Sequence, residues 1–70
     1  MNRYGIVIEK AGSNYSAFVP DLPGCVATGS TRAETERRIR TAIRLHIEGL
    51  HADGLDVPEP TSTVATVDAT

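Results

Sequence analysis

An amphipathic segment in the middle of the chain most constrains the fold. Thr31 is followed three residues later by Glu34, the spacing of a capping box, in which each side chain satisfies a backbone N–H that has no helical partner. The pattern predicts a helix that runs to about Ala52, where Asp53 and Gly54 stop it. At about 100° per residue, one stripe of this helix holds Thr35, Ile39, Ala42, Ile43, His46 and Leu50. Because this stripe must be covered, we expect it to pack on a sheet.

Three short segments before the helix carry the alternating pattern of strands. Arg3–Lys10 places apolar residues at every second position and is rich in β-branched side chains, which favours a strand. Ala11–Asn14 supplies turn residues and Tyr15–Val19 alternates again, so the two segments predict an antiparallel hairpin. Cys25–Thr28 predicts a third short strand, which Gly29 ends.

The stretch FVPDLPGCVATG, Phe18 to Gly29, places two prolines between the second and third strands. Val19 and Leu22 each precede a proline and are therefore pushed to extended conformations. The step Pro23-Gly24 suits the centre of a type II turn. These restrictions predict a stiff bend, which is either a rigid connector or a preorganised recognition loop that loses little entropy on binding a partner.

The last segment of the chain is interrupted by prolines and then rich in β-branched residues. Pro58 and Pro60 favour an extended link, and Thr63–Asp68 has the composition of a fourth strand, with a frayed tail as the alternative. A helix that returns across the sheet would let this strand lie parallel to the first strand. The predicted fold is α+β, with the order β-β-β-α-β and one long helix on one face of a three- or four-stranded sheet. Residues 1–57 are its core and 58–70 its extended tail.

Composition limits what this fold can do. A chain of 70 residues buries only about 60% of the surface that its unfolded form exposes, so the core is thin and a homo-oligomer, a dimer or larger, would support it. The formal charge of −2 is unevenly divided, because Thr31–Arg44 holds five arginines and two glutamates and the remainder is acidic. No apolar run is long enough for a membrane span, and Cys25 is the single cysteine, so we expect a cytoplasmic protein without disulfides.

The residues that carry chemistry form no catalytic or metal-binding pattern. His46 and His51 are five positions apart, which points them about 140° apart on a helix, so they cannot share a metal. Glu9, Glu48 and Asp68 lie on the elements that a two-metal nuclease would use, but Glu48 belongs to the outward face of the helix. We therefore expect no enzyme activity, no metal and no cofactor, and a residual nuclease is only a distant alternative.

A basic stripe of Arg37, Arg40 and Arg44 lies opposite the apolar face of the predicted helix. Such a stripe is either a solvated surface or a contact for nucleic acid. The acidic total charge, the three aromatic residues and the lack of a second helix favour the solvated surface. The nucleic-acid-binding module stays open as the alternative.

Four blocks of the sequence resemble one known family. The blocks YGIVIEK, YSAFVPDLPGCVATG, TRAETERRIRTAIRLHIEGL and VPEP, in this order and spacing from Tyr4 to about Pro60, resemble the N-terminal domain of HicB-family antitoxins. No single block is specific, but VPDLPGC, LHIEGL and PEP together are. The resemblance implies a partial RNase H-like fold, usually without nuclease activity, that binds the small basic mRNA-cleaving toxin HicA and masks its catalytic surface.

The resemblance also suggests a contact surface for the toxin. We expect Asp21, Leu22 and Pro23 in the bend to contact the partner, together with the acidic Glu9 and Asp68. An acidic body suits a basic partner. Many family members continue into a C-terminal DNA-binding domain, whereas this sequence ends at Thr70, so we do not expect direct DNA binding by this polypeptide alone. A HicB-like protein without a toxin is a further alternative.

Overall fold

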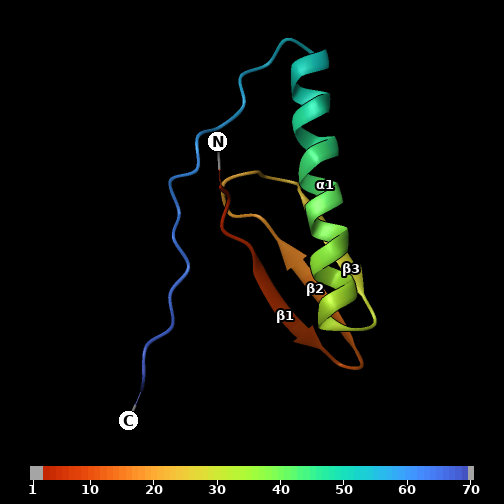
Figure 1. Ribbon diagram of the computed structural model, residues 1–70, viewed down its shortest axis with the longest axis vertical. Coiled ribbons are helices and arrows are strands. Elements are labelled where there is room, and N and C mark those ends of the chain that lie inside the picture. The colour runs from red at the N-terminus through yellow and green to blue at the C-terminus, as the bar shows by residue number, and fades with distance from the viewer. Residues whose placement is uncertain (1–2, 70) are drawn as a thin grey trace.

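The computed structural model describes residues 3–69 and shows a three-stranded antiparallel sheet with one long helix on one face (Figure 1). The strands are β1 (Val7–Ala11), β2 (Asn14–Phe18) and β3 (Val26–Gly29), in the spatial order β1-β2-β3, and the helix α1 is Arg32–Ala52. The predicted α+β class and the order of these four elements are confirmed. No helix within residues 3–69 has both the length and the apolar character that a membrane span requires.

β1 and β2 form the predicted hairpin. Their two-residue turn contains Gly12, whose φ of 63° lies in the left-handed region that glycine favours. β1 begins at Val7 and not at Arg3 as predicted. Val7 pairs with Phe18, the last residue of β2, after which the chain turns into the bend, so the residues before Val7 have no β2 residue opposite them.

The core lies between the sheet and α1. Its buried apolar side chains come from β2, the bend and the helix: Ala17, Val19, Leu22, Cys25 and Ile39. Burial raises the pKa of the Cys25 thiol. Thr35 is buried as well, and its hydroxyl donates to the carbonyl of Thr31 at 2.7 Å. A Cβ on Gly29 would lie 2.6 Å from the Thr35 hydroxyl oxygen, so the helix approaches β3 too closely for a side chain at this position.

Both predicted ends of the helix are confirmed. The Thr31 hydroxyl accepts the N–H of Glu34 at 3.1 Å, and the Glu34 carboxylate accepts the N–H of Ser30 at 2.9 Å, one residue earlier than a capping box predicts. The hydrogen bond from the Ser30 N–H is the main reason that the pKa of Glu34 lies below its ordinary value. At the other end, Gly54 follows the C-cap Asp53 and has a φ of 67°.

α1 is longer than the sheet that it covers. Its 21 residues span about 31 Å, against about 17 Å for a five-residue strand. Figure 1 shows its C-terminal half extending beyond the sheet. The helix contacts β3 and β2 more extensively than β1. Within the predicted apolar stripe, Thr35 and Ile39 are therefore buried, whereas Ala42, Ile43, His46 and Leu50 are partly buried.

The C-terminal segment is an extended tail. Residues 55–69 form no strand and run along the β1 side of the sheet in the direction of β1 (Figure 1). The fourth strand predicted over Thr63–Asp68 is therefore not formed. Within the described residues, no backbone–backbone hydrogen bond joins this segment to the sheet, and the N–H groups of Thr61 and Ser62, just before it, donate to a side chain of the bend.

Candidate partner-binding surface

The bend between β2 and β3 is closed by its own backbone. The N–H of Leu22 donates to the carbonyl of Val19 at 3.1 Å, and the N–H of Cys25 donates to the carbonyl of Leu22 at 3.0 Å. The second of these turns has Pro23 and Gly24 at its centre, and Gly24 has a φ of 84°, which confirms the predicted type II turn. A third bond, from the Val19 N–H to the Cys25 carbonyl at 3.2 Å, joins the two ends of the bend.

The side chains of the bend divide between the core and the surface. Leu22 is 0% exposed, and Val19 and Cys25 are buried beside it. Pro23 is exposed and Asp21 is half-buried. Because the Leu22 side chain is buried and fixes the bend on the core, it offers no exposed surface in this conformation, and its contact with a partner stays a prediction. Only Asp21 and Pro23 of the three predicted residues reach the surface.

The carboxylate of Asp21 binds the tail of the same chain. Oδ2 accepts the N–H groups of Thr61 and Ser62 at 3.0 and 2.9 Å. Oδ1 accepts the hydroxyl groups of the same two residues at 3.0 and 2.9 Å. No pattern in the sequence predicts this contact, because 40 and 41 positions separate the partners. The one local hint is Pro60, which keeps the backbone extended just before two hydroxyl-bearing residues.

These hydrogen bonds stabilise the ionised form of Asp21. The N–H of Ser62 is the largest cause that holds the pKa of Asp21 below its ordinary value. The Ser62 hydroxyl and both donors of Thr61 act in the same direction, against partial loss of hydration. Asp21 is therefore a charged anchor for the tail at neutral pH.

Two further contacts hold the tail beside the residues that precede β1. The hydroxyl of Tyr4 donates to the carbonyl of Pro58. A Cβ added to Gly5 would lie 3.1 Å from Cγ2 of Val64, so the tail passes close to the backbone there. Asp21, Tyr4 and Gly5 therefore contact one stretch of the tail, Pro58–Val64, which we call the strap.

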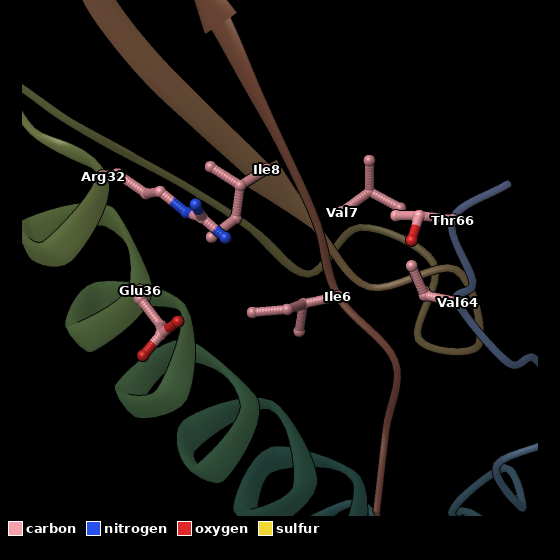
Figure 2. Close-up of a pocket in the computed structure, with 7 residues that line it drawn as sticks. All are labelled: Ile6, Val7, Ile8, Arg32, Glu36, Val64 and Thr66. Carbon is pink, nitrogen blue, oxygen red and sulfur yellow. The ribbon is translucent and has the colours of Figure 1, made fainter. Parts of the chain in front are cut away.

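A shallow hollow of about 320 Å³ lies between β1, the start of α1 and the tail (Figure 2). It is lined by Ile6, Val7, Ile8, Arg32, Glu36, Val64 and Thr66. Figure 2 shows Ile6 and Ile8 pointing toward the helix and Val7 pointing toward the tail. The lining offers one carboxylate, one guanidinium and one hydroxyl group beside apolar side chains, without a nucleophile paired to a base.

The acidic residues outside the bend are not gathered into one site. Glu9 is exposed in β1 opposite Ser16, and Asp68 is exposed on the tail. Within the part of the chain that the structure describes, no three His, Cys, Asp or Glu side chains are grouped as a metal site would require. Glu9 and Asp68 stay separate predicted contacts.

The arginine face of α1 is exposed. Arg37, Arg40 and Arg44 all point to solvent, and Arg40 pairs with Glu36 at 3.2 Å. The neighbouring Arg38 donates to the carbonyl of Thr28 at 3.1 Å, which ties the helix to β3. These features suit a solvated helix face, and the use of the three predicted arginines for nucleic acid stays a prediction.

Three curated relatives share much of this sequence. An uncharacterised 14.9 kDa protein of Haemophilus phage HP1 is 41% identical over 56 residues, which are 80% of this chain and 42% of that protein. A UPF0150 protein of Helicobacter pylori is 49% identical over 70% of this chain and 68% of its own length. A UPF0150 protein of Thermoplasma acidophilum is 35% identical over 96% of this chain and 99% of its own length. The chain thus spans less than half of the phage relative and nearly all of the archaeal one.

A solved structure and a family model also match this chain. A chain in the HicA3 and HicB3 toxin-antitoxin complex superposes with a TM-score of 0.74 at 32% identity, over 86% of this chain and 70% of that chain. The model of the HicB-like antitoxin of bacterial toxin-antitoxin systems matches residues 4–70. The chain therefore belongs to the HicB-like antitoxin family.

Proposed function

We propose that this protein is an antitoxin that binds a HicA-type mRNA-cleaving toxin and masks its catalytic surface. The observation that carries the proposal is the likeness to a chain of a toxin-antitoxin complex, which extends over most of the fold. The family membership supports the same role. Binding is the whole of this function, so the proposal needs no catalytic group, metal or cofactor, and it places the protein in the cytoplasm with its mRNA-cleaving partner.

The bend and the separate acidic side chains supply the physical basis of binding. Pro23 projects from a bend that backbone hydrogen bonds and the buried Leu22 hold in one conformation, so little entropy is lost when a partner contacts it. Asp21, Glu9 and Asp68 contribute negative charge toward a basic toxin, which favours encounter and correct orientation. Leu22 supports this surface from below.

Co-expression with a small basic toxin of the HicA type tests the proposal. The two proteins should co-purify, and growth should be restored to cells that express the basic protein. Replacing Glu9 and Asp68 by Lys should weaken the complex, because the two lysines would repel a basic partner that the native carboxylates attract. Failure both to co-purify and to restore growth would refute the toxin-binding role.

A charge-reversed helix is the matched control in the same experiment. The triple variant Arg37→Glu, Arg40→Glu, Arg44→Glu replaces positive charges by negative ones on an exposed helix face that has no part in the proposed toxin contact. It should protect cells as well as the native chain does. If the native chain binds RNA or DNA at low salt and the triple variant loses that binding, the nucleic-acid-binding alternative is supported instead.

A further inference from the structure

The carboxylate of Asp21 is saturated by the strap. A carboxylate offers about four lone-pair positions, and four donors from Thr61 and Ser62 occupy them, two on each oxygen. A lysine or arginine of another protein could form a direct hydrogen bond with Asp21 only if it displaced some of these donors. The predicted contact residue is therefore covered by its own chain.

The strap can leave without unfolding the domain. The bend is closed by hydrogen bonds among Val19, Leu22 and Cys25, none of which involves the strap. The buried core consists of side chains from β2, the bend and α1. The strap itself is mostly exposed and is connected to α1 through Gly54, a flexible type of residue at a left-handed position. Release of the strap therefore removes few buried contacts and leaves the bend in place.

We propose that the strap is a releasable cover on the bend, and that the strap and a basic partner compete for the carboxylate of Asp21. The competition rests on the proposed function, since it assumes a basic toxin as the partner. When the strap is bound, Pro23 is exposed but Asp21 has no free acceptor position. When it leaves, Asp21 and Pro23 form one continuous contact surface. Because the partner needs this open state, the measured affinity equals the affinity of the open state multiplied by the fraction of time that the strap is open.

A chemical probe tests the cover without any partner. Carbodiimide activation followed by coupling to glycinamide converts accessible carboxylates to amides, and mass spectrometry reports the rate at each residue. In the native chain Asp21 should react more slowly than Asp68. The carboxylate of Asp68 is exposed, lies on the tail beyond the strap and forms no hydrogen bond with it. Equal rates at the two residues would overturn the proposal.

A strap variant then provides the matched comparison. Thr61→Val with Ser62→Pro removes three of the four donors and leaves Asp21 intact. It should raise the coupling rate at Asp21 about tenfold, because hydrogen bonds to a charged group are among the stronger ones, and leave the rate at Asp68 unchanged. Thr63→Val, a change at an exposed neighbour outside these four bonds, is the control and should behave as the native chain does.

The toxin provides the second arm. The strap variant should bind the co-expressed basic protein more tightly than the native chain, by up to about tenfold if the strap is closed for about nine-tenths of the time. Equal or weaker binding would refute the competition even if the coupling rate had risen. If neither form binds the basic protein, the proposed function fails, whereas the coupling rates still decide whether the strap covers Asp21.

Discussion

The bend and the tail meet at Asp21, but they are held in place in different ways. The bend is fixed within seven residues, Val19 to Cys25, by three backbone hydrogen bonds and by the buried side chain of Leu22. The tail is held by one carboxylate that lies 40 positions earlier in the sequence, together with a few contacts near Tyr4 and Gly5. The bend therefore carries its own rigidity, whereas the order of the tail depends on the bend.

Truncation of Leu22 should have the largest effect on the stability of the bend. Leu22→Ala should lower the free energy of unfolding by about 2–5 kcal/mol, because it removes a fully buried side chain from a thin core. Urea unfolding followed by circular dichroism measures the change. Leu45→Ala, at a helix position that is 58% exposed, is the control and should change stability by only about 0.5 kcal/mol. Similar losses in the two variants would show that Leu22 does not anchor the bend.

A pair of glycine substitutions separates backbone conformation from packing. Neither a Cβ at Gly24 nor one at Gly49 would meet another atom within 4 Å. Gly24 has a φ of 84°, so Gly24→Ala should destabilise the protein by about 1–2 kcal/mol. Gly49 is helical, so Gly49→Ala should stabilise it by up to about 1 kcal/mol. Thermal unfolding of both variants checks the opposite signs, and a neutral Gly24→Ala would mean that the bend is less rigid than its hydrogen bonds indicate.

Acid should loosen the tail before it affects the bend. The pKa of Asp21 is lower in the folded chain than its ordinary value of 3.8, so its contribution to folding is complete above that value and is lost as the pH falls through the lower, folded value. The amide protons of Thr61 and Ser62 should therefore shift in NMR spectra below pH 3.8, while that of Cys25, bonded to a backbone carbonyl, should not move with them.

The Asp21→Asn variant is the control for this pH dependence. It keeps the size of the side chain but has no charge to titrate, so the two strap amides should show no separate acid transition. Titration of Glu34, whose pKa is also lowered, affects the helix cap and not the tail. A transition of the strap amides that persists in Asp21→Asn would assign the acid response to another group.

What could be predicted from the sequence follows the same division between local and distant contacts. The helix with its caps and the type II turn at Pro23 and Gly24 depend on residues that are close together in the sequence, so the sequence predicts them. The attachment of Thr61 and Ser62 was missed, because a hydrogen bond across 40 positions leaves no periodic signal. The β-branched composition of Thr63–Asp68 predicted a strand, but strand formation also requires free backbone donors in register with a neighbour, which composition does not reveal.

The burial of Cys25 gives the molecule a natural reporter of core opening. Its thiol lies beside Leu22 in the core, and burial also raises its pKa, so both access and thiolate formation oppose alkylation while the domain is folded. The rate of reaction with a maleimide should therefore depend on the opening of the core and should not change when the strap leaves. This one side chain distinguishes loss of the fold from loss of the tail contact without an engineered label.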